Sequence, residues 1–198
     1  MEYQPMMPPF EIGAFDEMKK REAQRHLDWY VSEIPIRLEL LKSLYARSGK
    51  NPKELDLSPE SLIPLWSWFM PTVQTVQLSK REFEKMRAQY PEWIWDELAN
   101  WEVHVKSLNI AMDIGIYFGE VMIAKYPKMK WGFVEKPKSY IDLNKPTIMY
   151  PTGADCCPSR ILNTLTSKAA TKESFSKELF EAFQVNTKPC RALIENRE

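Results

Sequence analysis

The chain reads EVHVKSLNIAMDIGIYFGEVMIAKY from Glu102 to Tyr126, and this stretch decides the fold class. It is the second half of the longest periodic stretch, which begins near Glu92 with a break near Trp101, and Pro127 ends it. Small and apolar residues recur on one face of the predicted helix: Val105, Leu108, Met112, Gly115, Gly119 and Met122. The spacing therefore predicts a long central helix on which other elements pack.

Two glycines on this face are unusual for a helix interior. Gly115 and Gly119 are four residues apart, so they lie one above the other. Each costs a helix about 1 kcal/mol relative to alanine. We therefore expect another backbone or a large ring, such as a tryptophan, to approach this face closely. The charge on the helix disfavours the alternative, a membrane dimer built on small residues.

The opposite face carries a polar stripe, formed by Glu102, Lys106, Asn109, Asp113, Tyr117 and Glu120. Asp113, Tyr117 and Glu120 project together over two turns, so they are candidate binding residues. Two carboxylates beside a phenol could perform acid–base chemistry or hold a hard metal ion. The same residues could also form a solvated face or pair with Lys and Arg of a neighbouring helix, and the sequence favours that interpretation.

Helix signals lie on both sides of the central stretch. Ser58-Pro59 is a strong helix start, and Ser79 with Glu82 forms a capping box. Pro35 either kinks a helix or begins a new one. Helices are expected over residues 15–33, 58–71, 79–90, 159–169 and 172–184, the last followed by a polar tail. After Pro35 the apolar stripe continues to a stop near Ser48 and Gly49.

Short strands are expected after the central helix. Trp131, Phe133 and Tyr140 lie in segments with strand-like alternation or turn chemistry, and 146–150 is a second strand candidate, followed by a loop over 151–158. The prediction is a mainly α fold: a multi-helix single domain over 14–198, with a small β-hairpin or short sheet near residues 130–150. Residues 1–13 hold three prolines and are expected to form an extended arm.

The composition excludes several classes of partner. The 198 residues include 27 Lys plus Arg and 27 Asp plus Glu, so the formal net charge is zero and no global field attracts nucleic acid. No apolar run approaches the ~20 residues of a membrane span, and the N-terminus has no signal-peptide pattern. We expect a cytoplasmic protein that binds neither nucleic acid nor membrane.

The sequence shows no cofactor, metal or catalytic motif. Phosphate-loop, dinucleotide and nucleophile-elbow patterns are absent, and neither His26 nor His104 lies in a zinc-binding pattern. Cys156, Cys157 and Cys190 are expected to be reduced thiols. The first two precede a helix start that could lower a thiol pKa, but a nucleophile also needs a base.

Tryptophan density is the remaining signal. Five tryptophans fall within 36 positions: Trp66, Trp68, Trp93, Trp95 and Trp101. In each W-x-W pair the two rings point to different sides, so one should be buried and the other partly exposed. Exposed tryptophan marks binding surfaces, although an aromatic-rich core explains the same composition. Trp68, Trp95 and Trp131 join the polar stripe as candidate binding residues.

Three stretches together resemble a family of uncharacterised bacterial proteins, mainly from Gram-positive species. They are 26–30 with 34–37, 55–62 with Trp66 and 68–69, and 113–120 followed by Trp131. Some members look like immunity proteins of toxin systems, and the resemblance implies no catalytic residue.

Two functions follow from the sequence. The first is a non-enzymatic protein-binding module with a protein partner, such as an immunity protein of a bacterial toxin system. The alternative is a metal-dependent or acid/base hydrolase that uses Asp113 and Glu120, which requires both carboxylates to face a cleft. A structural subunit of a larger assembly is a third, weaker hypothesis.

Overall fold

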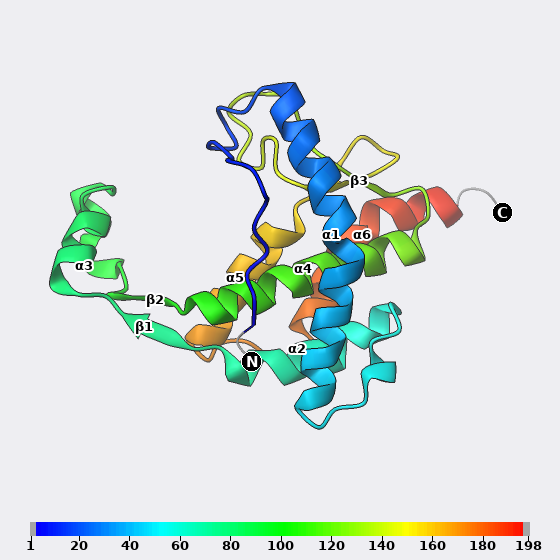
Figure 1. Ribbon diagram of the computed structural model, residues 1–198, viewed down its shortest axis with the longest axis horizontal. Coiled ribbons are helices and arrows are strands. Elements are labelled where there is room, and N and C mark those ends of the chain that lie inside the picture. Colours follow the sequence, from blue (N-terminus) through cyan, green and yellow to red (C-terminus); the bar gives the residue numbers. More distant parts are fainter. Residues whose placement is uncertain (1–2, 196–198) are drawn as a thin grey trace.

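The computed structural model describes residues 3–195 and side chains as far as Lys188. The fold is mainly α (Figure 1). The α-helices are α1 Lys20–Arg47, α2 Leu62–Phe69, α3 Lys80–Arg87, α4 Val105–Lys125, α5 Pro158–Ala170 and α6 Glu178–Glu195. The 3₁₀ segments are η1 Pro52–Glu54, η2 Pro59–Ser61, η3 Met70–Thr72 and η4 Glu92–Glu97. The strands are β1 Thr75–Gln77, β2 Trp101–Val103, β3 Lys130–Gly132, β4 Thr147–Met149 and β5 Asp155–Cys156.

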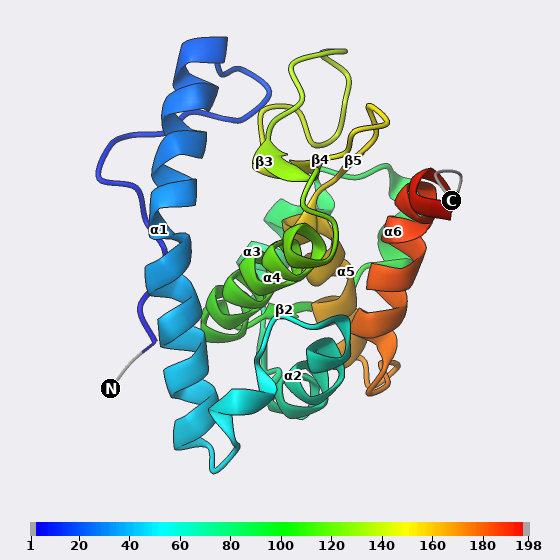
Figure 2. The same ribbon diagram turned by 90° about the vertical axis from the view of Figure 1, so that its right-hand side faces the viewer.

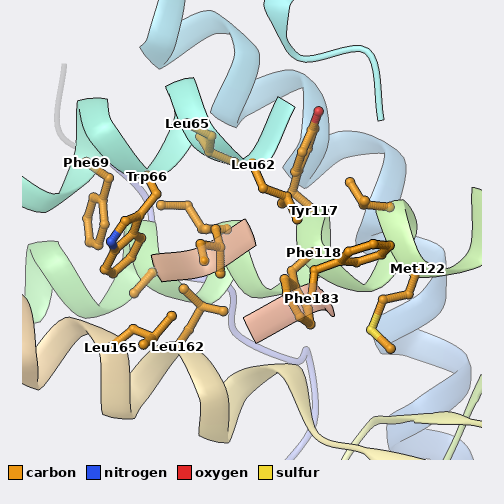
Figure 3. Packing of buried hydrophobic residues seen from close by; sticks show 14 of the residues in the cluster. Leu62, Leu65, Trp66, Phe69, Tyr117, Phe118, Met122, Leu162, Leu165 and Phe183 are labelled. Atoms are coloured by element: carbon orange, nitrogen blue, oxygen red, sulfur yellow. The ribbon is translucent and has the colours of Figure 1, made fainter. Parts of the chain in front are cut away.

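Helix α4 is the centre of the molecule, as predicted. Figure 2 shows α1 on one side of α4 and α5 and α6 on the other, with α2 below. Side chains of α2, α4, α5 and α6 meet in one core (Figure 3). The labelled members are Leu62, Leu65, Trp66, Phe69, Tyr117, Phe118, Met122, Leu162, Leu165 and Phe183. Within residues 3–195, α4 alone is long and apolar enough to cross a membrane, but 67% of that window is buried, as in the core helix of a soluble protein.

The close approach predicted for the glycine face is confirmed. A Cβ added to Gly115 would lie 3.6 Å from the backbone C and O of Pro158, at the start of α5. A Cβ added to Gly119 would lie 2.4 Å from the Trp131 ring. The α5 backbone therefore packs on Gly115 at a distance that a methyl group would just fill, whereas only a glycine at position 119 leaves room for the indole. The outer end of the same face is solvent-exposed at Val105 and Leu108.

Helix α1 runs without interruption for 28 residues and contains Pro35. Of the two alternatives left open for Pro35, the start of a new helix is therefore wrong. Pro35 is exposed, whereas Ile34 and Leu41 are buried against the core. Packing of the inner face holds both halves together although proline removes one helical hydrogen bond on the outer face.

The predicted sheet near residues 130–150 is confirmed. Strands β3, β4 and β5 form an antiparallel sheet with Trp131 opposite Ile148 and Ile148 opposite Cys156. Strand β5 lies in the segment expected to be loop. A second antiparallel pair, β1 with β2, was not predicted because its strands have three residues each and the second interrupts an apparent helical period.

The two ends of the chain differ from the expectation. The extended arm packs on the body, with Tyr3 and Met6 buried and its chain alongside α1 (Figure 2). At the other end α6 continues to Glu195, where a polar tail was expected after residue 184. Residues 196–198 and the side chain of Cys190 lie outside the described part of the chain.

Candidate functional site

Asp113, one of the three candidate binding residues of the predicted polar stripe, lies in a buried ion pair. It is 0% exposed, and Arg37 of α1 donates to it through Nε at 2.7 Å and through an Nη at 2.8 Å. The hydroxyl of Tyr3 also donates to Asp113. Burial raises the pKa of Asp113, and the bonds from Arg37 and Tyr3 oppose that rise. The alternative of pairing with a neighbouring helix therefore applies to this carboxylate.

The side chain of Tyr117 stabilises the turn that precedes α2. Its hydroxyl lies 2.6 Å from Ser61 Oγ and accepts the amide of Leu57 at 3.0 Å. Leu57 has φ 64°, a left-handed backbone that few non-glycine residues adopt. Burial raises the pKa of Tyr117. This phenol is therefore fixed between α4 and the 57–61 segment rather than presented to a ligand.

Glu120 and Trp131 are brought together. Trp131 Nε1 donates to Glu120 Oε1 at 2.7 Å, and both residues are half-buried. The indole covers Gly119 and meets Tyr30 edge-on at 5.3 Å between ring centroids. The three stripe residues thus bond to three different sets of partners, although they lie on one side of α4. Among residues 3–195 no group of three or more His, Cys, Asp or Glu is placed to hold a metal ion.

The first W-x-W pair behaves as predicted. Trp66 is fully buried, and its Nε1 donates to Ser174 Oγ at 3.0 Å. Trp68 is half-buried and packs edge-on against Tyr45 with ring centroids 5.2 Å apart. Trp68 therefore belongs mainly to the wall of the core.

Residues 74–104 form a protrusion, the name we use for β1, α3, η4 and β2 together. Figure 1 shows the β1–β2 ribbon leaving the body and carrying α3 at its far end. Two backbone hydrogen bonds extend the pairing of β1 with β2 at either end. His104 N donates to Gln74 O at 2.8 Å, and Leu78 N donates to Asn100 O at 2.9 Å. His104 also caps α4, because its Nδ1 accepts the amide of Lys106.

The tip of the protrusion has a small core of its own. Trp95 Nε1 donates to the carbonyls of Arg87 and Tyr90, both at 3.0 Å. The guanidinium of Arg87 lies 4.3 Å from the Trp95 ring centroid and 5.8 Å from that of Phe83. The predicted capping box of Ser79 and Glu82 starts α3. Trp95, a predicted binding residue, instead holds the tip together.

Trp93 is the exposed member of this second pair. It is 81% exposed, and Tyr90 beside it is 46% exposed. The W-x-W spacing predicts one exposed ring but does not say which, so Trp93 was missed as a candidate. The choice depends on Arg87, whose side chain covers Trp95 from the preceding helix.

Among the described side chains, Cys156, Cys157 and His26 form no activated nucleophile. Burial raises the pKa of Cys156 to about 12 and also raises that of Cys157, so the lowered pKa considered for a thiol at this helix start is not found. Burial lowers the pKa of His26, whose ring packs between Phe15 and Trp29. Burial thus opposes the thiolate form that a cysteine nucleophile would need.

Comparison of the chain with family models, curated proteins and solved structures finds no match. The function is therefore inferred from the sequence and from the geometry of the structure.

Proposed function

We propose that this chain is a non-enzymatic protein-binding module that contacts its partner through the tip of the protrusion. The observation that carries the proposal is Trp93, an indole 81% exposed on a structured tip outside the body. Exposed tryptophan is favoured at interface hot spots because it buries a large rigid surface on binding.

The construction of the tip supports this role. The bonds of Trp95 and the stacked guanidinium of Arg87 fix the segment that presents Trp93. A presenting surface that is already ordered loses less conformational entropy on binding. The bonds within the tip therefore serve to preorganise an exposed contact residue.

Both charge signs flank Trp93. Helix α3 has the sequence KREFEKMR, with four basic and two acidic residues, and η4 has EWIWDE, with three acidic residues. A polar rim of mixed sign around an aromatic centre is typical of specific, reversible interfaces.

The resemblance to immunity-protein-like bacterial proteins supports a toxin protein as the partner, met in the bacterial cytoplasm. The hydrolase alternative has less support. Asp113 is bonded to Arg37 and Tyr3 while Glu120 holds Trp131, so the two carboxylates do not share a cleft.

Photo-crosslinking tests the proposal. A photoreactive amino acid replaces Trp93 in one variant and Val185 in a control, since Val185 lies on α6 and is 70% exposed. The probe is the purified product of the gene adjacent to the coding sequence. We expect a crosslink from position 93 and none from 185. Labelling from both positions, or from 185 alone, would contradict the assigned surface.

Affinity measurement gives the second arm. We expect Trp93→Ala to weaken binding of the same protein roughly 30-fold or more, the effect of a hot-spot residue. Val185→Ala should leave the dissociation constant unchanged. If the Trp93 and Val185 variants bind equally well, the protrusion is not the interface.

A further inference from the structure

A cleft of 510 Å³ lies between the N-terminal arm and the body. Met6 lines it from the arm, Phe15 lines it from the segment between the arm and α1, and Trp29 and Met112 line it from α1 and α4. Its volume falls within the roughly 300–1,000 Å³ of small-molecule sites, and its wall has the usual aromatic and thioether character of such sites. The cleft is separate from the protrusion, so it is independent of the proposed protein interface.

Two nearly fully buried polar side chains of α1, Tyr30 and His26, line this cleft. Tyr30 is 6% exposed and His26 is 5% exposed. Within the part of the chain that the structure describes, Nδ1 of His26 is a buried atom with no hydrogen-bond partner. The Tyr30 hydroxyl, one turn further along α1, makes no hydrogen bond to a described residue. More than nine in ten buried polar groups in proteins have a partner, so the buried nitrogen of His26 points to a polar molecule in the cleft.

The charge of the cleft favours an anion. Arg160 Nε donates to Asp142 Oδ2 at 2.6 Å, and Lys145 lies 3.3 Å from the other oxygen of Asp142. Asp142 is fully buried, so two cations share one carboxylate. Arg160 and Lys145 both line the cleft, whereas none of its lining residues is Asp or Glu. An excess positive charge thus faces this space.

Arg160 has the geometry to receive a carboxylate. Its side chain is 51% exposed, and its terminal nitrogens donate to no residue in the described part of the chain. The planar guanidinium matches the two oxygens of a carboxylate, and the bond from Nε to Asp142 holds it in place.

We propose that this cleft binds a small organic acid with an apolar, preferably aromatic, body. The carboxylate lies on Arg160, the body lies against Trp29, Phe15 and Met112, and the Tyr30 hydroxyl donates to a polar atom of the ligand. The buried carboxyl group Asp142 orients Arg160 and does not touch the ligand.

Calorimetric titration of the full chain tests this assignment with matched probes. The acids are 3-phenylpropionate and octanoate, and the corresponding alcohols, 3-phenylpropanol and octanol, lack the charge. We expect each acid to bind at least tenfold more tightly than its alcohol, and 3-phenylpropionate more tightly than octanoate. Equal affinity for acid and alcohol, or no binding of either acid at millimolar concentration, would overturn the proposal and leave a cleft filled by water only.

Three variants locate the site. Arg160→Gln should remove the preference for acid over alcohol, while Arg81→Gln on exposed α3 should keep it. Because Arg160 also pairs with buried Asp142, Tyr30→Phe provides a variant that removes only an unbonded hydroxyl. We expect Tyr30→Phe to fold normally and to bind the acids several-fold more weakly. Unchanged acid binding in both cleft variants would place the ligand elsewhere and contradict the assignment.

Discussion

The body and the protrusion both contain tryptophans, but their indole rings have different surroundings. In the body Trp66 is fully buried and Trp131 lies on Gly119, so each ring is fixed by contacts from several elements. In the protrusion Trp95 is held by the neighbouring segment 87–90, and Trp93 is exposed. The body should therefore respond to substitutions as one cooperative unit, whereas the tip should respond locally.

The largest expected effect is in the body, at the buried pair. Arg37→Met leaves Asp113 with no cation at a fully buried position, because the remaining Tyr3 hydroxyl supplies a donor but no charge. We expect a loss of about 3–5 kcal/mol in the free energy of unfolding, the usual result of breaking a buried ion pair on one side. Chemical denaturation measures it.

The double variant Arg37→Met with Asp113→Leu is the control. Removing both charges should recover most of the loss, because the desolvated carboxylate no longer exists. If the double variant is as unstable as the single one, then the packing of Arg37 rather than the unpaired charge sets the stability.

The next largest change in stability is expected at one of two glycines on the same helix. Gly119→Ala places a methyl group 2.4 Å from the Trp131 ring, which Glu120 and Tyr30 hold in position. We expect a loss of about 1–3 kcal/mol from overpacking. Gly115→Ala meets only ordinary contacts at 3.6 Å or more, so its higher helix propensity should stabilise the protein by roughly 0.5–1 kcal/mol. Thermal unfolding of both variants gives the sign of each change in stability. If both variants are more stable than the wild type, then the Trp131 ring moves aside at little cost.

A smaller effect is expected in the protrusion. Trp95→Ala removes two hydrogen bonds and the stacking surface of Arg87, so amide exchange across residues 79–98 should become faster. The free energy of global unfolding should change by less than about 0.5 kcal/mol, as for sites outside the core. Trp93→Ala should alter neither quantity. Hydrogen exchange read by mass spectrometry separates these outcomes, and an equal increase in exchange rate in the helices of the body would refute the local response.

The sequence predicts the parts of this comparison that depend on local spacing. The central helix, the close approach at Gly115 and Gly119, the capping box at Ser79 and the sheet near residues 130–150 all follow from periodicity or from single-residue chemistry. Contacts between residues that are distant in sequence cannot be predicted in this way. Arg37 and Asp113 are 76 residues apart, and Tyr3 is 110 residues from Asp113, so the polar stripe could not reveal that Asp113 is already paired.

Pro35 and Trp93 are two further positions at which the local sequence alone does not determine the structure. The local preference of proline predicts a helix break, but buried contacts on both sides of Pro35 keep α1 continuous. The W-x-W spacing gives the correct pattern of one covered and one exposed ring, but the covering residue, Arg87, lies on another element. Tertiary contacts decide both outcomes.

The smallest expected effect concerns His26 of α1, in the body. Burial lowers the pKa of His26 in the folded protein, so between the folded pKa and about 6.5 the unfolded chain binds more protons than the native one. Stability should therefore fall as the pH falls below about 6.5 and then level off below the folded pKa. His26→Phe keeps the aromatic packing against Phe15 and Trp29 and removes this titration, so its advantage over the wild type should grow with acidification. Denaturation midpoints from pH 7.5 to 5 measure that difference, and an imidazole resonance of His26 that titrates at or above pH 6.5 would contradict the assigned sign.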